Sequence, residues 1–593
     1  MLLLIFSFNA MAQQIPVYRT QPVLVNPTNF REIEPDAVVE LPPNSTSKAA
    51  TLDDVLRGAP GLVVARSGGT GQPSTLFIRG AAGGHTLVLL DGVEINDPSQ
   101  PAGGFDFSTV DLNLVEKIEI FKGPQALRYG SGAIGGVVNI VTKRGGDRQN
   151  IFSARAGSHQ TNQLTAIRLG ETYSLSVTRF ETAGISAAAR RPELDGHRYV
   201  GAAFRGGAQL SEDTGWEAIS RVVSSSSDLD FSSSNSGPNF IEADDPNYHV
   251  KNWSMSHALK GQTKWNSQWK SNFALSRFHL RRRYHNPPDV INPAEFYDDR
   301  HSDSTKIESV TAYAVDSTTT VSFGLSARLE QTKNSAWIAG AFADVNLSRK
   351  PFFIHTGGRY DYHKKFGQHF TYALGPGVRL FTDTTLTMRL ASAFKAPSLF
   401  QIYDSTFGNA NLQPEKVWGE EASLEQGFGE NSRAKITAFR YHYRDLIQFT
   451  SRYQNVSSAR TSGVEVEYSH KFSAADIQGV YTFTDARDDQ TGARLLRRPR
   501  NSWRVSAGLA ASESLKFRAE FRELGSRPDV DAISSAGVMV PGYDVLDISA
   551  ALTVAAKTQI SASVENTFDR DYEEVAGYGT PGLGFYCGIK TEL

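Results

Sequence analysis

This sequence has a single cysteine, no long apolar run after its first dozen residues, and a formal net charge of only −2. A single cysteine, Cys587, excludes an internal disulfide and a thiolate metal cluster. After the first dozen residues, no apolar run approaches the ~18 residues that a membrane-spanning helix requires. The formal net charge of −2 excludes the strong basic excess of nucleic-acid-binding proteins. A transmembrane β-barrel stays possible, because polar residues facing its lumen dilute the hydropathy.

The N-terminal 50 residues predict export followed by an extended segment. Residues 1–12 combine a short apolar run with the small-residue pattern Ala-Met-Ala, which indicates a signal peptide. Residues 13–50 are polar and proline-rich, and they predict an extended N-terminal segment. An apolar island, Val23 to Val25, lies between Pro22 and Pro27. Such an island suits strand addition to a partner's sheet edge, although these residues alone favour an incidental patch.

Residues 51–146 predict a small α/β domain rich in glycine turns. Thr51 followed by Asp54 resembles a capping box at the start of a short helix. Strands are expected at residues 62–65, 75–78, 86–90, 117–121 and 137–142. The turn GSGAIG at 130–135 matches GxGxxG, but a β-branched strand follows where a dinucleotide site needs a helix. We therefore interpret its glycines as close-packed turn residues.

In residues 147–593, apolar and polar side chains alternate with a period of two. Phe439, Tyr441 and Tyr443, for example, alternate with basic residues, as expected of strands with differently solvated faces. No linker interrupts this region, and at about 20 residues per strand and turn it predicts about 22 antiparallel strands. We therefore expect an all-β transmembrane barrel with the 51–146 domain as an α/β plug in its lumen.

No catalytic motif accompanies this pattern. Neither a GxSxG nucleophile elbow nor an HExxH zinc motif occurs, so we do not expect an enzyme. A passive porin is a competing interpretation, but a porin should lack both the plug and the N-terminal coupling segment.

Several stretches carry a resemblance to a known family. They are GAPGLVV (58–64), SGGTGQPSTLFIRG (67–80), HTLVLLDGVEIN (85–96), VEKIEIFKGP (115–124), YGSGAIGGVVNIVTK (129–143), RRPRNSW (497–503) and VENTFDRDY (564–572). The chain resembles the TonB-dependent outer-membrane receptors, and among them most closely the cobalamin transporters. This implies active import across the outer membrane of a Gram-negative bacterium. The expected ligand is a corrinoid, with a ferric siderophore as the alternative.

The resemblance also implies functional residues at both ends of the plug. Residues 22–28 resemble the TonB box, in which Val23, Leu24, Val25 and Asn26 would pair with the periplasmic TonB energy transducer. Ligand contacts are expected from Ser67, Thr70, Gln72, Asn96, Asp97 and Ser99. Neutral hydrogen bonds from such residues suit a ligand fringed with amides. Turn chemistry alone explains the same residue types equally well.

The early barrel loops are rich in acids, which raises the question of calcium. The acids are Glu193, Asp195, Asp228, Asp230, Glu242, Asp244 and Asp245. Calcium takes six to eight oxygen ligands, and the resemblance implies calcium ions that order these loops. We expect Asp195, Asp230, Asp244 and Asp245 as ligands; merely solvated acidic loops are an equal alternative. No other cofactor is expected.

Partners beyond the transducer and the ligand are also expected. Outer-membrane lipid and lipopolysaccharide should surround the barrel, and the basic run at 277–285 is a candidate phosphate contact. A solvated strand is the simpler interpretation of that run. A surface-exposed lipoprotein or a substrate-binding protein is a further candidate partner, whereas nucleic acid is not.

Overall fold

The computed structural model describes residues 18–19, 36–40, 51–101, 103–189, 192–230, 245–290, 292–531, 534 and 536–593. Within these ranges, no helix has the length and apolar character needed to cross a membrane. The predicted signal peptide and the predicted TonB box, Val23 to Asn26, lie outside the described residues.

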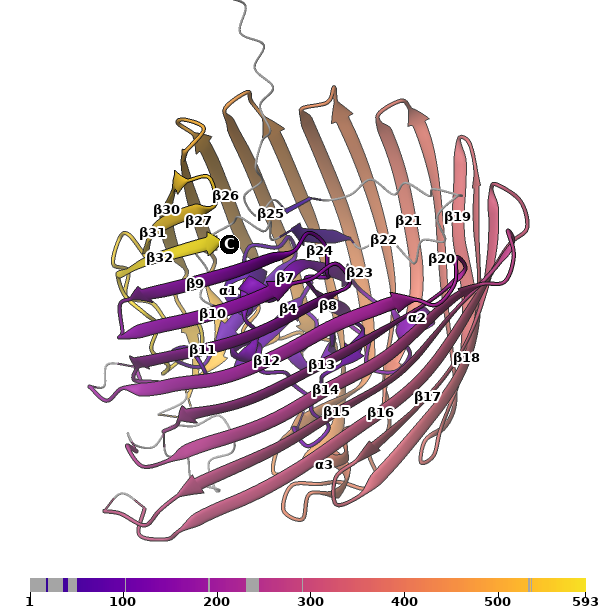
Figure 1. Ribbon diagram of the computed structural model, residues 1–593. Helices are drawn as coiled ribbons and strands as arrows, with labels where there is room; N and C mark the ends of the chain where they lie inside the picture. Colours follow the sequence, from indigo (N-terminus) through magenta and orange to yellow (C-terminus); the bar gives the residue numbers. More distant parts are fainter. Residues whose placement is uncertain are drawn as a thin grey trace, which may run out of the picture.

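Twenty-two antiparallel strands form one closed barrel, as the sequence predicted (Figure 1). Consecutive strands are neighbours, and β32 closes the barrel by pairing with β9. The strands are β9 (Gln149–Gly157), β10 (Thr161–Leu169), β11 (Tyr173–Ile185), β12 (Asp195–Gln209), β13 (Thr214–Asp228), β14 (His249–Lys264), β15 (Trp269–Asn286), β16 (Phe296–Ala314), β17 (Thr319–Gln331), β18 (Ser335–Arg349), β19 (Phe352–His363), β20 (Gly367–Phe381), β21 (Thr384–Lys395), β22 (Glu415–Phe428), β23 (Ser432–Phe449), β24 (Tyr453–Lys471), β25 (Ala475–Asp488), β26 (Asn501–Ala510), β27 (Leu515–Leu524), β30 (Tyr543–Ala555), β31 (Thr558–Glu565) and β32 (Gly584–Glu592).

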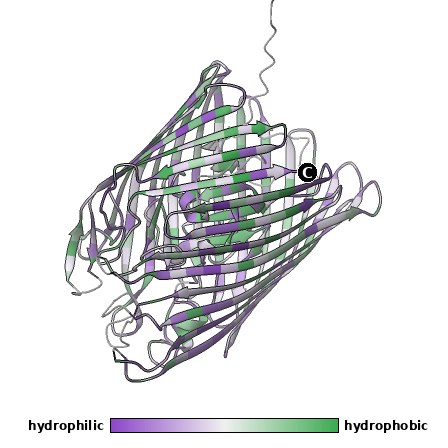
Figure 2. Cartoon of the chain, turned by 60° about the vertical axis from the view of Figure 1, so that its left-hand side comes forward, coloured by the Kyte–Doolittle hydropathy of each residue, from purple (hydrophilic) through white to green (hydrophobic). Residues whose placement is uncertain are grey.

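The two faces of the barrel wall are distinguished by the pleat. On β15, Phe273 and Leu275 are exposed on the outer face, whereas Phe278 and Leu280 are buried against the plug. Successive residues of a strand point to opposite faces, so this alternation separates lipid-facing from lumen-facing side chains. The mixture of hydrophobic and hydrophilic residues along each strand in Figure 2 reflects the same alternation.

The two ends of the barrel differ in the length of their connections. At one end the turns contain two to four residues, as at 210–213 and 350–351. The other end carries longer connections, including 186–194, 229–248, 396–414, 525–542 and 566–583. Outer-membrane barrels have short periplasmic turns and long extracellular loops. The long-loop end, at the bottom of Figure 1 beside α3 (Leu399–Tyr403), is therefore the extracellular end.

The plug lies inside the barrel and is built on one mixed sheet in the order β1-β2-β7-β8-β5-β6 (Figure 1). Strands β5 and β8 are parallel and the other pairs are antiparallel. The sheet strands are β1 (Tyr18–Arg19), β2 (Ala37–Glu40), β5 (Thr86–Leu90), β6 (Val93–Glu94), β7 (Val115–Lys122) and β8 (Gly136–Thr142). A separate hairpin contains β3 (Leu62–Arg66) and β4 (Ser74–Ile78), and the short helices are α1 (Leu52–Leu56) and α2 (Ala126–Tyr129).

The plug begins as its sequence suggested, but its sheet reaches further upstream than the compositional boundary. Thr51 caps α1 and forms a capping box with Asp54. Strand β2 comes from the proline-rich segment and pairs with β7, since Ala37, Val38 and Val39 are apolar enough to be fully buried. GSGAIG leads directly into β8, which agrees with a structural role for its glycines.

Candidate ligand and metal sites

Buried charges fix the plug to one side of the barrel. Arg79 follows β4 and donates to Glu465 on β24 at 2.8 Å and to Glu421 on β22 at 2.7 Å. Lys122 at the end of β7 pairs with the other oxygen of Glu465 at 2.8 Å. Both plug cations are almost fully buried. Each has a hydrogen-bonded carboxylate partner, as buried charges require.

The plug and the barrel approach each other so closely beside this cluster that position 61 requires a glycine. A Cβ at Gly61 would lie 1.9 Å from the Glu465 carboxylate, and its φ of +72° also disfavours a side chain. The plug backbone therefore touches the charged barrel wall directly.

The first outward turn of the plug, residues 67–72, joins β3 to β4. Gln72 is buried, and its Nε2 donates to the carbonyl oxygen of Asp228, at the extracellular end of β13, at 2.7 Å. Gly71 packs so closely on His197 that a Cβ would lie 2.4 Å from the imidazole ring. Ser67 and Thr70 are half-buried. Gln72 thus anchors the turn to the barrel, while Ser67 and Thr70 are the more accessible predicted residues of this turn.

The second outward turn, residues 96–103, is held by its own polar side chains. Asn96 accepts from Val88 N at 2.7 Å and donates to Thr86 O and Gly103 O. Asp97 is buried and accepts from Ser99 N, Ser99 Oγ and Ser302 Oγ within 2.9 Å. These bonds give Asn96, Asp97 and Ser99 a structural role in shaping the turn. A direct role in ligand binding stays a prediction for all six plug residues.

A group of aromatic side chains lies at the extracellular end, near the second turn. Phe449 lies 5.3 Å from Phe407 and 5.2 Å from Tyr453, measured between ring centroids. The Arg300 guanidinium lies 4.9 Å from the ring centroid of Phe400. Gln100 Nε2 of the turn lies 3.5 Å from the hydroxyl of Tyr284. Sequence reasoning missed this group, because its members come from separate strands and loops and share no local motif.

Three acidic side chains of the early barrel loops form one compact cluster. Glu193, Asp195 and Asp230 each offer a carboxylate oxygen, and these atoms lie within 4.8 Å of one another. Two oxygens on opposite sides of a calcium ion at about 2.4 Å are about 4.8 Å apart, so the spacing fits part of a calcium shell. Asp195 also accepts from Ala187 N at 2.5 Å and Asp230 from Ala188 N at 2.9 Å. The cluster therefore also fixes the backbone of the 186–194 loop at Ala187 and Ala188.

Asp245, the other predicted calcium ligand among the described residues, is not one of these three acids. Asp245 is buried and accepts from Asn286 Nδ2 at 2.6 Å, and burial raises the pKa of its carboxyl group. Asp244 lies outside the described residues. The structure thus brings Asp195 and Asp230 together and adds Glu193, which the prediction had left out of its four.

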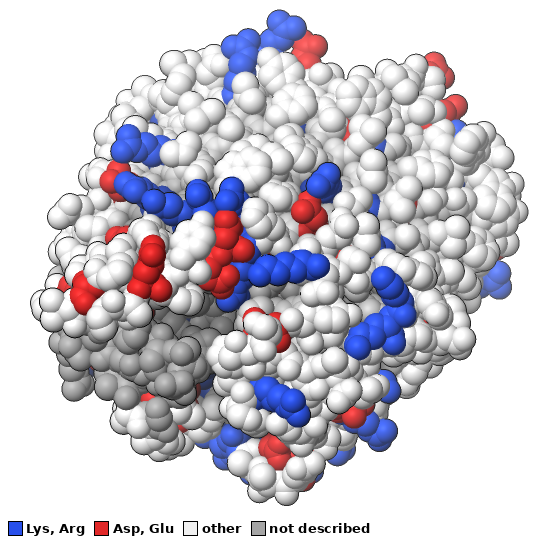
Figure 3. Space-filling model, turned by 90° about the horizontal axis from the view of Figure 1, so that it is seen from below, with Lys and Arg blue, Asp and Glu red and all other residues white. Residues whose placement is uncertain are grey.

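Seen from the extracellular end, acidic and basic side chains are interspersed among uncharged ones (Figure 3). Among the described residues of this face, basic and acidic side chains lie close to one another rather than in an extended field of one sign, which would steer a highly charged ligand.

A plug filling a closed 22-stranded barrel defines a plugged outer-membrane transporter rather than an open channel. Family comparison agrees: a model described as "TonB dependent receptor-like, beta-barrel" matches residues 128–566, and "TonB-dependent Receptor Plug Domain" matches 44–137. The chain belongs to the TonB-dependent receptor family. It is an outer-membrane receptor and transporter of a Gram-negative bacterium, and the family implies a TonB partner.

Individual relatives differ in their ligands. The chain is 27% identical over 574 residues to the vitamin B12 transporter BtuB of Vibrio cholerae serotype O1, covering 92% of this chain and 90% of that protein. Among solved structures, the siderophore receptor PirA from Acinetobacter baumannii has a TM-score of 0.79 at 19% identity, covering 94% of this chain and 98% of that one. The copper transporter OprC has a TM-score of 0.79 at 15% identity, with the same coverage. These structural likenesses show the fold alone.

Proposed function

We propose that this receptor imports a corrinoid such as cobalamin. The observation that carries the proposal is the 27% identity to the vitamin B12 transporter over 92% of the chain. The geometry is compatible, because Ser67 and Thr70 offer neutral hydrogen-bonding groups on an accessible turn. Corrinoids carry many amide groups, which such side chains and exposed backbone recognise without a charged partner.

A ferric-siderophore receptor is the second candidate. The aromatic group around Phe407, Phe449 and Tyr453, with Arg300 beside Phe400, would suit an aromatic and anionic ligand. A passive porin is disfavoured, because buried ion pairs hold the plug against the barrel wall.

The proposal includes a calcium ion bound at the acidic cluster. Glu193, Asp195 and Asp230 would supply carboxylate oxygens, and the ion would neutralise the repulsion among them. By holding the 186–194 loop against the plug turn 67–72, such an ion would order one wall of the ligand site. Gly68 already approaches Ala187 in that loop so closely that a Cβ at Gly68 would lie 2.9 Å from the Ala187 Cα.

Calorimetry tests both parts. Purified receptor is titrated with cyanocobalamin and with a panel of ferric siderophores, in calcium and in chelator. We expect cyanocobalamin to bind at micromolar concentration or below and calcium to tighten binding. If cyanocobalamin fails to bind while a siderophore binds, the corrinoid proposal is wrong and the family assignment is unaffected. An affinity unchanged by chelator would remove the calcium proposal.

The predicted TonB box has a separate test. Deleting residues 22–28 should abolish uptake in cells and leave ligand affinity nearly unchanged, because the predicted ligand turns face the extracellular end whereas a TonB box is expected to act from the periplasm. Loss of affinity together with uptake would contradict this assignment.

A further inference from the structure

The middle of the loop between β31 and β32 (residues 566–583) folds onto the plug, whereas residues 568–571 are exposed. Val575 and Ala576 are fully buried in a cluster with Ala65 and Phe77 of the plug. The Arg527 guanidinium donates to the carbonyl oxygens of Glu573 and Glu574, and Asp529 accepts from Ala576 N at 3.0 Å. The loop is therefore a defined structure with a fixed orientation toward the plug.

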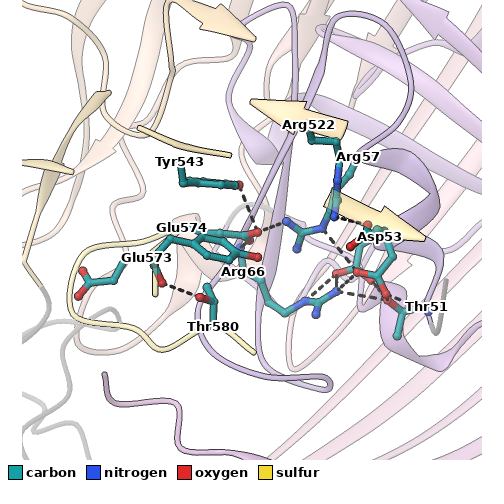
Figure 4. Close-up of polar contacts among 12 residues, drawn as sticks. Thr51, Asp53, Arg57, Arg66, Arg522, Tyr543, Glu573, Glu574 and Thr580 are labelled. Atoms are coloured by element: carbon teal, nitrogen blue, oxygen red, sulfur yellow. Dashed lines mark hydrogen bonds and ion pairs between the residues drawn. The ribbon is translucent and has the colours of Figure 1, made fainter. Parts of the chain in front are cut away.

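Glu574 extends from this loop into the plug (Figure 4). One oxygen of its buried carboxylate pairs with the Arg57 guanidinium, and the other accepts from Arg66 N at 2.9 Å. Arg57 caps the C-terminal end of α1, and Arg66 precedes the outward turn 67–72. A single side chain of an extracellular loop thus contacts both the first helix of the plug and the base of a ligand turn.

The contacts continue from Arg66 to the beginning of the plug. The Arg66 guanidinium donates to Asp53 at 2.9 and 2.5 Å, to Asp54 at 2.9 Å and to Thr51 Oγ1 at 3.2 Å (Figure 4). Thr51 is where the chain enters α1 from the N-terminal segment. Hydrogen bonds and ion pairs, joined through the Arg66 side chain, therefore connect the start of α1 with the extracellular loop.

We propose that Glu574 is a positioning residue for transport, which couples the 566–583 loop to the start of the plug. Displacing Thr51 and Asp53, as tension on the N-terminal segment would do, removes the partners of Arg66. Glu574 then loses its fixed counterpart and the loop is released on the opposite side of the membrane. Because Glu574 contacts the plug only through Arg57 and Arg66 in the described interactions, it should act through them.

A double-mutant cycle on the full-length receptor tests this coupling. A spin label at Asp571→Cys, an exposed position in the loop, reports loop mobility in a Cys587→Ser background that leaves no other cysteine. We expect Glu574→Gln to raise the mobile fraction threefold or more. Asp53→Asn, changed only in the plug, should do the same, and the double variant should exceed neither single variant.

Glu573→Gln provides the matched control. Glu573 accepts from Gly577 N at 2.9 Å within the loop, so removing its charge weakens this bond and loosens the loop without touching the plug. Its effect should therefore add to that of Asp53→Asn. The proposal is overturned if Asp53→Asn leaves the label unchanged, or if its effect adds to that of Glu574→Gln. Arg57→Gln breaks the same contact from the plug side and replaces Glu574→Gln if that variant does not assemble.

Discussion

Two of the charged contacts between the plug and the rest of the chain differ in what they join the plug to. Arg79 and Lys122 pair with Glu421 and Glu465, which lie on barrel strands. Arg57 and Arg66 meet Glu574, which lies on a loop. Strands hydrogen-bonded on both sides cannot move singly, whereas a loop can open at lower cost. The first contact therefore anchors the plug, and the second can transmit a change.

The largest effect is expected from breaking the anchor. Arg79→Ala leaves Glu421 and Glu465 buried with one partner fewer, which should destabilise the plug by about 3–5 kcal/mol. Hydrogen–deuterium exchange of β7 and β8 in increasing urea measures this directly. Lys117→Ala is the control, because its pair with Glu119 is half-exposed and should contribute about 0.5 kcal/mol or less. Equal exchange in both variants would contradict the anchor assignment.

A smaller effect is expected from the acidic cluster. At a calcium concentration 100-fold above its dissociation constant, binding should stabilise the receptor by about 2.7 kcal/mol. Replacing both Asp195 and Asp230 by Asn should abolish the difference in melting temperature between calcium and chelator. Asp213→Asn, in a short turn at the opposite end, should preserve it. A calcium effect that survives in the double variant would place the ion elsewhere.

These regions also differ in how far the sequence could predict them. The barrel, the plug and the capping box at Thr51 follow from local periodicity and turn chemistry, which nearby residues determine. The anchor joins Arg79 to residues more than 340 positions away, and Glu574 meets Arg57 across 517 positions. No local pattern specifies such pairs, because only barrel closure brings them together. Among the ligand residues that the family resemblance implied, Gln72 and Asn96 carry amide groups that the fold uses for internal hydrogen bonds.

The smallest effect concerns pH and distinguishes the loop contact from any neutral packing role. Burial alone would raise the pKa of Glu574, but the charges of Arg57 and Arg66 outweigh it and lower the pKa below its ordinary value of 4.5. The other ionisable groups around it are Asp53, Asp54, Arg522, Arg527, Tyr543 and Tyr572. Asp54 likewise has a lowered pKa, because Arg66 and Arg57 outweigh its burial.

A carboxyl group whose pKa is lower in the folded state stabilises that state above its unfolded pKa and loses this contribution as the pH falls. The mobility of the Asp571→Cys label should therefore stay constant from pH 8 to about pH 5 and increase only as the pH falls well below 4.5. In Glu574→Gln the label should already be mobile at pH 7, and the remaining acid response should be smaller. A wild-type transition near pH 6.5 would instead implicate a histidine, since an unperturbed imidazole titrates near that pH. Such a transition would mean that Glu574 does not control the release of the loop, and it would leave the anchoring role of Arg79 unaffected.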